Sequence, residues 1–144
     1  MPTVVDLESL VRASGDAIIV ADPDGTIRFW NPAAERIFGF TADEAIGGSL
    51  DLIVPEPFRD RHWAGYREVM RTGQTRYGAD VLRVPALRKD GRPLSIAFTV
   101  ALLHGSDGQV RSIAAIVRDE TARWEEERAL RRRLAELEGR RPSP

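Results

Sequence analysis

Five short stretches of this chain are rich in apolar residues and are bounded by turn residues, a pattern typical of β-strands. In the stretch 92–103, for example, Leu94, Ile96, Phe98 and Val100 fall on one face. Asp24-Gly25 lies between the first two stretches and favours a tight hairpin. The pattern predicts strands at about 16–22, 26–30, 76–88, 92–103 and 110–118.

Two other stretches repeat apolar residues every three or four positions, which is typical of amphipathic helices. The first predicts a helix over Asp6–Ala13, with apolar positions at Leu7, Leu10 and Val11. The second is expected from about 58 to 72. It follows Pro55-Glu56-Pro57 and precedes Gly73, because proline favours a helix start and glycine a helix end.

The segment 29–47 combines a strand end with two short capped helices. Asn31 is suited to cap a helix that begins at Pro32, where the missing amide donor costs nothing, and Gly39 is suited to end that helix. Thr41-Ala42-Asp43-Glu44 then has the spacing of a capping box. Both helices are therefore predicted from local side-chain chemistry.

The C-terminal part of the chain is dense in charge and predicts one long helix over 119–138. Leu130, Leu134 and Leu137 step by four and three, as positions in a coiled-coil seam do. Three other segments complete the expected organisation: an N-terminal cap helix over 1–14, a central domain over 15–118 and a disordered tail over 139–144.

Composition excludes several classes of protein. With 21 basic and 22 acidic residues and a net charge of −1, the chain has no overall field that would attract nucleic acid. It has no cysteine, so disulfides and thiolate metal sites are excluded. No apolar run approaches the roughly 20 residues of a membrane span, and no secretory signal is visible, so we expect a cytoplasmic chain without membrane contact. No catalytic constellation emerges, and no enzymatic activity is expected.

The order of three motifs carries a family resemblance: DGTI at 24–27, WNPAAERIFGF at 30–40 and TADEAIG at 41–47. Together they resemble the first half of a PAS domain, a sensor fold of bacterial signalling proteins. The resemblance implies an α+β fold: a five-stranded antiparallel sheet, short helices on one face, an N-terminal cap helix and a C-terminal linker helix. Val117-Arg118-Asp119-Glu120-Thr121 also resembles the sequence at which PAS domains pass into an output helix.

A second resemblance concerns Pro55-Glu56-Pro57 and the helix after it. In haem-binding PAS domains similar to the rhizobial oxygen-sensor kinase, this segment leads into a helix that bears the proximal histidine. His62 matches that histidine, and Gly73 and Arg88-Lys89-Asp90-Gly91 follow at compatible distances. The resemblance implies haem b with His62 as axial ligand, and a neutral imidazole is suited to ligate its iron.

The sequence departs from that subfamily at the supporting positions. A tyrosine three residues after the histidine and an arginine three further on are replaced by Gly65 and Glu68, and tyrosine occurs one place later, as Tyr66. The position of the distal arginine falls on Leu82. Arg83 is next to it, but neighbouring strand residues point to opposite faces. An apolar distal side would favour carbon monoxide or nitric oxide over oxygen.

The predicted facing of strands and helices supplies the candidate walls of this pocket, which are Ile53, Val69, Ile96, Phe98, Ile113 and Ala115. Trp63 adjoins His62 but points about 100° around the predicted helix. His104 lies beside the turn at 105–108 and is expected to be exposed.

The function implied is sensory: a core ligand changes the packing of the sheet, and the C-terminal helix relays the change. The implied partners are a histidine kinase of a two-component system, a cyclase or another effector, together with a diatomic gas. A homodimer is expected through the N-terminal helix, the sheet face and the C-terminal helix. Two alternatives stay open at this point. One is a cofactor-free dimerisation or protein-interaction module, and the other is a sensor of a small organic ligand.

Overall fold

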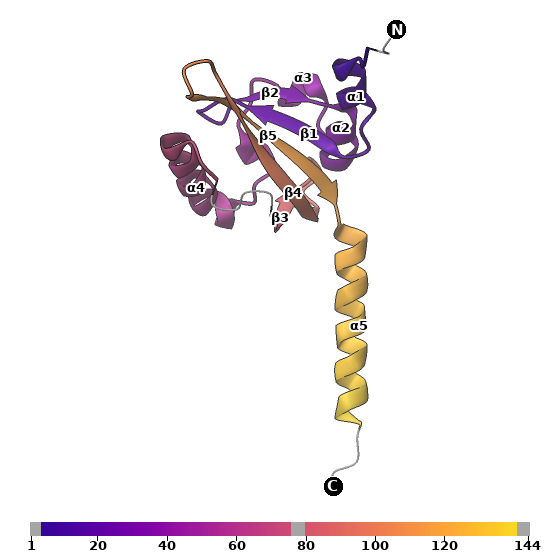
Figure 1. The fold of residues 1–144 in the computed structure, drawn as a ribbon. Helices are drawn as coiled ribbons and strands as arrows, with labels where there is room; N and C mark the ends of the chain where they lie inside the picture. Colours follow the sequence, from indigo (N-terminus) through magenta and orange to yellow (C-terminus); the bar gives the residue numbers. More distant parts are fainter. Residues whose placement is uncertain (1–3, 76–79, 141–144) are drawn as a thin grey trace.

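A five-stranded antiparallel sheet forms the centre of the computed structural model, which describes residues 4–75 and 80–140. The strand order is β2-β1-β5-β4-β3, so the first and the last strand of the chain, β1 and β5, lie side by side inside the sheet (Figure 1). The α+β fold expected from the sequence is confirmed. The strands are β1 (Ala17–Ala21), β2 (Ile27–Trp30), β3 (Leu82–Leu87), β4 (Pro93–His104) and β5 (Val110–Asp119).

Short helices pack against the sheet, and one long helix follows its last strand. In chain order the helical segments are α1 (Leu7–Ala13), α2 (Pro32–Phe38), α3 (Ala42–Ala45), the 3-10 turns η1 (Leu50–Leu52) and η2 (Glu56–Phe58), α4 (Arg59–Thr72) and α5 (Thr121–Gly139). The caps are those expected. The Asn31 side chain accepts from the amide of Ala34, and Thr41 and Glu44 form the capping box.

The boundaries differ most at the third strand, which was expected to begin near residue 76. Residues 76–79 lie outside the described part of the chain, and β3 begins at Leu82. At the other end of the molecule, α5 runs one residue past its expected end, to Gly139. Most of the predicted disordered tail, residues 141–144, also lies outside the described residues.

Asn31 joins three elements at the most deeply buried polar position of the described chain. Its side chain is fully buried, and Oδ1 accepts from the amides of Ile18 (2.9 Å) and Ala34 (3.0 Å). Its Nδ2 donates to the carbonyl oxygens of Val11 (2.9 Å) and Asp16 (3.1 Å). One amide thereby fixes α1, β1 and α2 to one another, since a buried polar group must be hydrogen-bonded to be tolerated.

Strand register separates an inner face of the sheet from an outer face. Ile19 of β1 is opposite Ala115 of β5, and Ala115 is opposite Val100 of β4. Directly opposed residues lie on the same face, so these three share the inner face with the buried core. The neighbouring positions carry the outer-face residues, which are Ile18, Val20, Thr99, Ala101, Leu103, Ala114 and Ile116.

Helix α5 stands clear of the rest of the molecule (Figure 1). Its base is held at β4, where the amide of Glu120 donates to the carbonyl oxygen of Ser95 (2.8 Å) and the amide of Ser95 donates to Thr121 Oγ1 (3.0 Å). Every described residue from 122 to 140 is exposed. The seam residues Leu130, Leu134 and Leu137 are 59%, 57% and 54% exposed.

Candidate functional site

The helix that carries His62 begins where the prolines predict. The turn η2 covers Glu56–Phe58, and α4 continues from Arg59 until Gly73 adopts a left-handed conformation and ends it. The Arg59 side chain donates to the carbonyl oxygens of Val54 (3.0 Å) and Asp51 (3.3 Å). These bonds fix the first turn of α4 to the segment just before it.

His62 lies half-buried on α4 between two aromatic rings. Its imidazole meets the Trp63 ring edge-on at 4.7 Å between centroids and the tilted Tyr66 ring at 5.8 Å. Nδ1 is buried, and no group in the described part of the chain forms a hydrogen bond with it. A buried nitrogen without a hydrogen bond is costly in a native structure, and a bound ion, water or ligand often satisfies it.

Burial lowers the pKa of His62 from its usual value, and nearby Asp51 opposes that shift only in part. Removal from water disfavours the charged imidazolium, so the neutral ring is the form the fold prefers. The neutral ring is also the form that coordinates a metal, because its free lone pair is the ligating group.

Trp63 and Tyr66 attach α4 to the hairpin formed by β1 and β2. The Trp63 Nε1 donates to Asp51 Oδ1 (2.7 Å), and its ring lies over Gly25. The Tyr66 hydroxyl donates to the carbonyl oxygen of Asp22 (2.6 Å). The sequence did not predict these contacts, because their partners lie far apart in the chain. Asp24-Gly25 predicted the hairpin turn but not the residues that pack against it.

The candidate wall residues fall into two groups. Ile53 and Ile96 are buried, and Phe98, Ile113 and Ala115 are partly buried against the same hydrophobic cluster, which also contains Tyr66. Val69 is half-buried on α4, seven residues after His62, and is outside that cluster. The structure thus brings five of the six together with the tyrosine that contacts His62, while their role as walls of a ligand site stays a prediction.

Burial fades along the inner face of β4. Leu94 and Ile96 are 7% and 5% exposed, whereas Phe98, Val100 and Leu102 are only half-buried. On β3, Ala86 is buried but Val84, opposite Ile96, is 39% exposed. The sheet therefore presents an apolar inner surface that the helices cover incompletely at this end.

The register of β3 settles the orientation of two neighbouring residues. Leu82 is opposite Phe98 and lies on the inner face, as expected. Arg83 lies on the outer face, where its Nε is 3.3 Å from Glu120 Oε2 at the base of α5. From Leu82 to Ala86 on β3 and from Leu94 to Leu102 on β4, the side chains at inner-face positions are apolar: Leu82, Val84, Ala86, Leu94, Ile96, Phe98, Val100 and Leu102.

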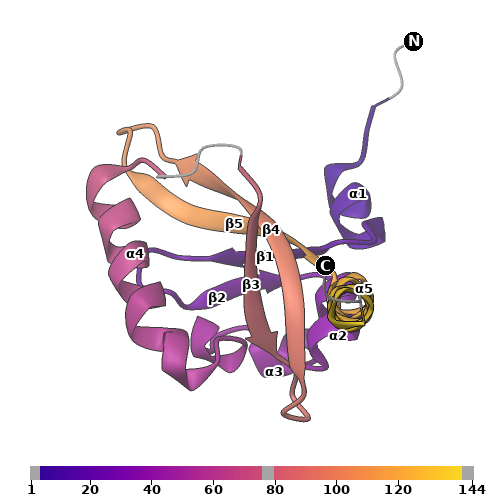
Figure 2. The ribbon, with the colours of Figure 1, turned by 90° about the horizontal axis from the view of Figure 1, so that it is seen from below.

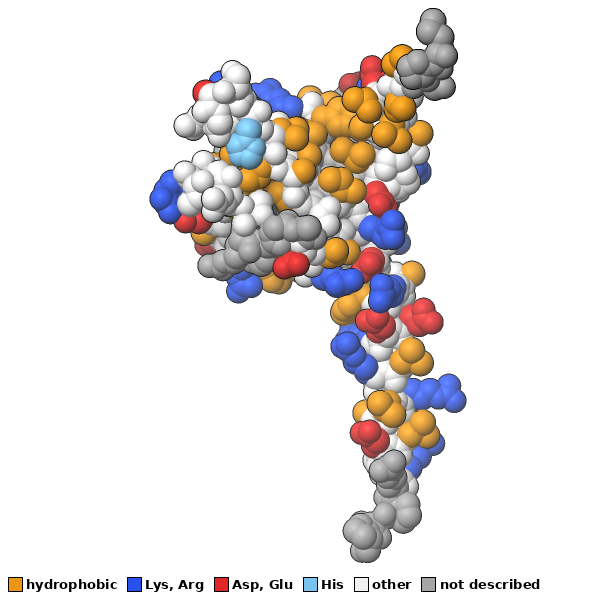
Figure 3. Space-filling view, in the orientation of Figure 1, with side chains coloured by type: hydrophobic (Ala, Val, Ile, Leu, Met, Phe, Trp, Pro, Cys, Tyr) orange, Lys and Arg blue, Asp and Glu red, His pale blue; other side chains and the backbone are white. Residues whose placement is uncertain are grey.

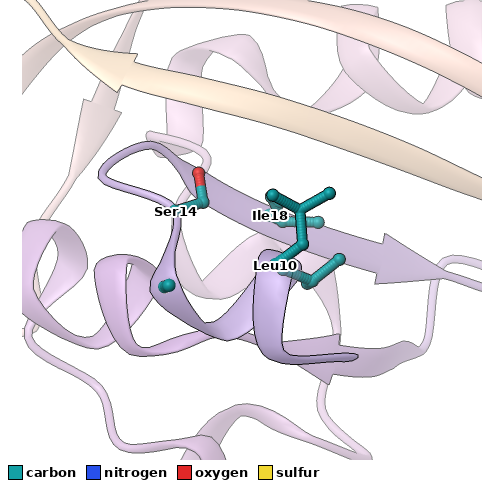
Figure 4. Close-up of a pocket in the computed structure, with 5 residues that line it drawn as sticks. Leu10, Ser14 and Ile18 are labelled. Carbon is teal, nitrogen blue, oxygen red and sulfur yellow. The ribbon is translucent and has the colours of Figure 1, made fainter. Parts of the chain in front are cut away.

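Other candidate features lie elsewhere in the described chain. An open hollow of about 310 Å³ lies between α1 and β1, lined by Leu10, Val11, Ala13, Ser14 and Ile18 (Figure 4). His104 is exposed, as expected. Over residues 4–75 and 80–140, no group of three or more acidic, histidine or cysteine side chains is placed to hold a metal ion.

A small antiparallel sheet with short helices on one face and a helix leaving its last strand defines a class of α+β signalling domains. Within that class the chain belongs to the PAS family: the model described as PAS fold matches residues 11–125. The PAS domain of a protein from Colwellia psychrerythraea has the same fold, with a TM-score of 0.71, 22% identity, and coverage of 81% of this chain and 95% of that one.

Two relatives have named sensory roles. The chain is 33% identical over 137 residues to the sensor protein FixL of Bradyrhizobium diazoefficiens, which covers 91% of this chain and 26% of FixL. It is 29% identical over 117 residues to the oxygen sensor protein DosP of Escherichia coli, which covers 79% of this chain and 14% of DosP. The chain therefore spans about a quarter or less of the length of these relatives.

Proposed function

We propose that this chain is the sensory module of a signalling protein and that it binds haem b through His62, with a diatomic gas as the signal. The observation that carries the proposal is the state of His62: burial lowers the pKa of its imidazole and so favours the neutral ring, and Nδ1 has no hydrogen-bond partner among residues 4–75 and 80–140. The similarity to an oxygen sensor protein supports the same conclusion.

The residues present fit such a group in two respects. A single histidine suffices as a protein ligand because the porphyrin supplies four nitrogens itself. The incompletely covered inner face of the sheet offers an apolar surface for a largely apolar ring system. His62 would hold the iron, and Ile53, Val69, Ile96, Phe98, Ile113 and Ala115 would line the ring. The group, when bound, would supply an open coordination position for a gas.

The apolar inner face supports a preference among gases. Dioxygen at an iron centre draws negative charge and is stabilised by a hydrogen-bond donor, whereas carbon monoxide needs none. Leu82 is on the inner face and Arg83 pairs with Glu120 on the other side. We therefore expect carbon monoxide or nitric oxide to be held better than oxygen.

The relay to an effector would run through α5. The base of α5 is bonded to Ser95 on β4, one residue before Ile96 of the candidate pocket. A ligand would shift the sheet between two states of similar free energy, in proportion to its different affinity for each. The effector would be a histidine kinase, a cyclase or another signalling domain. We infer a cytoplasmic, non-enzymatic role. In the described chain no helix combines the length and apolar character needed to cross a bilayer.

A second candidate, a cofactor-free dimerisation module, is favoured by exposed apolar side chains. Leu7 and Leu10 of α1 are 69% and 60% exposed, and Leu103 on the outer face is 45% exposed. Hydrophobic side chains gather over the visible face of the sheet and beside α1 (Figure 3). Together with the seam of α5, they would support a homodimer through α1, the sheet face and α5. A small organic molecule on the inner face is the remaining alternative.

Absorption spectroscopy tests the haem proposal. The purified full chain is mixed with hemin, and a Soret band is expected that His62→Ala abolishes and His104→Ala keeps. A protein that stays colourless with hemin, or a band that survives His62→Ala, would overturn it. In that case removal of residues 119–144 tests the dimerisation module and locates its interface: loss of dimers indicates association through α5, and persistent dimers indicate the sheet or α1.

A further inference from the structure

The turn between β1 and β2, Asp22–Thr26, is in direct contact with the helix that carries His62. Figure 2 shows α4 at the end of the sheet where β1 and β2 meet their connecting turn. The carbonyl oxygen of Asp22 accepts from the amide of Gly25 (2.9 Å), which closes the turn. The same oxygen accepts from the Tyr66 hydroxyl (2.6 Å), so one atom holds both the turn and the helix.

Gly25 is required at this place for two separate reasons. Its φ of +87° lies in the left-handed region, which side chains other than that of glycine seldom adopt. A Cβ there would also lie 2.2 Å from Cη2 and 2.3 Å from Cζ3 of the Trp63 ring. The indole can therefore rest directly on the turn only because this residue has no side chain.

The two aromatic rings that reach the turn are the ones that contact His62. Trp63 is fixed at its other end by Asp51, through the 2.7 Å bond from Nε1, and Tyr66 is fixed at its hydroxyl. The two rings themselves meet at 5.2 Å between centroids. The imidazole thus contacts two side chains whose own positions the Asp22–Thr26 turn determines.

We infer that the Asp22–Thr26 turn is a positioning site for His62, acting through Trp63 and Tyr66. This inference rests on the proposed function, since it assigns the turn a part in setting how the imidazole is offered to a ligand. It extends that function, because Gly25 and Asp22 touch neither His62 nor the candidate wall residues in any contact described above. They act on His62 indirectly, through Trp63 and Tyr66.

The chain offers a matched pair of glycines to test it. Gly91 has a φ of +85°, close to that of Gly25, but a Cβ there would meet nothing within 4 Å. Gly25→Ala and Gly91→Ala therefore impose the same backbone strain, and only the first displaces Trp63. We expect Gly25→Ala to shift the imidazole NMR signals of His62 in the hemin-free chain and to raise the hemin dissociation rate about tenfold. Gly91→Ala should leave both readouts near wild type, with only its thermal midpoint lowered.

A double-mutant cycle isolates the route through the indole. In a Trp63→Ala background the ring is gone, so Gly25→Ala should move the His62 signals no more than Gly91→Ala does. The inference is overturned if Gly25→Ala and Gly91→Ala act alike on His62 in the wild-type background. It is also overturned if the effect of Gly25→Ala persists after both the Trp63 indole and the Tyr66 hydroxyl are removed, in Trp63→Ala/Tyr66→Phe.

Tyr66→Phe provides a milder variant in case Gly25→Ala does not fold. It removes one hydroxyl, and we expect a Soret maximum displaced from that of wild type and hemin dissociation faster by about fivefold. Phe38→Leu, a core variant in α2, serves as the control for lost stability and should leave the Soret position unchanged. If Tyr66→Phe matches Phe38→Leu in Soret position, Tyr66 does not position His62.

The NMR arm separates this inference from the proposed function. If the wild-type chain takes up no hemin, the haem proposal fails, and the His62 signals of the hemin-free variants still decide whether the turn controls the imidazole. If hemin binds through His62 but all variants give wild-type signals and rates, the haem proposal stands and the positioning role fails.

Discussion

The two halves of the sheet are covered in different ways. Over β1 and β2, the side chains of Trp30, Phe38 and Ile27 are at most 2% exposed, and Asn31 bonds to three neighbouring segments. Over β3 and β4, Ala86, Leu94 and Ile96 are buried, but Phe98, Val100 and Leu102 on the same face are only half-buried. The first half provides a rigid frame. The β3–β4 half keeps apolar surface that a ligand could cover, because a fully packed interior would leave no space for a ligand.

The largest expected effect comes from truncating the same residue type in each half. Phe38→Ala removes a fully buried ring and should lower the free energy of unfolding by about 4 kcal/mol. Phe98→Ala removes a half-buried ring on the inner face and should cost about half as much. Urea denaturation of both variants measures the two values. Equal losses of unfolding free energy in the two variants would show that the two halves of the sheet are packed equally tightly.

Removal of the Asn31 side-chain amide should come next. Asn31→Ala removes the side-chain partner of four backbone groups, although the Asp16 carbonyl oxygen keeps its bond from Ser14 Oγ, and should cost about 3 kcal/mol in urea denaturation. Asn31→Asp keeps the acceptor used by Ile18 and Ala34 but loses the donor to Val11 and Asp16. Its second carboxylate oxygen would face the carbonyl oxygens of Val11 and Asp16, so at neutral pH this variant should be at least as unstable as Asn31→Ala. An Asn31→Ala protein as stable as wild type would show that the frame does not depend on this residue.

A smaller effect, which concerns His62 on α4, is a dependence of stability on pH. The pKa of His62 in the folded chain lies below its unfolded value of 6.5. As the solution is acidified, the unfolded chain therefore binds more protons than the folded chain does. The contribution of the neutral ring is therefore complete above about pH 6.5 and declines as the pH falls toward the folded pKa. His62→Gln should flatten the slope in this window, whereas His104→Gln should keep it. A wild-type slope retained in His62→Gln would mean that burial of this ring is not its cause.

The smallest effect on stability is expected in α5. Leu130→Ala and Leu134→Ala alter side chains that are more than half exposed, so the free energy of unfolding of the monomer should change by less than about 0.5 kcal/mol. Sedimentation of the same variants reports on association, and weaker dimers at unchanged monomer stability would support a seam between two copies. A large loss of monomer stability would indicate that α5 packs on its own sheet.

Much of the frame could be predicted because its determinants are local. The Asn31 cap and the Thr41 capping box lie within four residues of the groups they satisfy. The same alternation that predicts β3 and β4 also places Leu82 and Arg83 on opposite faces, and the observed register confirms this.

The surroundings of His62 could not be predicted in the same way. Helical geometry separates Trp63 from His62 by about 100° at the backbone, yet their rings meet at 4.7 Å. What brings the indole there is Asp51, twelve residues away, and the turn near Gly25. Tertiary contacts of this kind leave no periodic signal in a sequence.

The exposed helix α5 has the geometry of a lever that would enlarge a small motion at its base. Its 19 residues span about 28 Å at 1.5 Å per residue, and only its first turn is bonded to the sheet. A tilt of about 10° at Thr121 would carry the far end sideways by about 5 Å, close to the rise of one helical turn. A sub-ångström rearrangement near Ser95 would thus become a displacement large enough to change which side chains of a neighbouring helix are met.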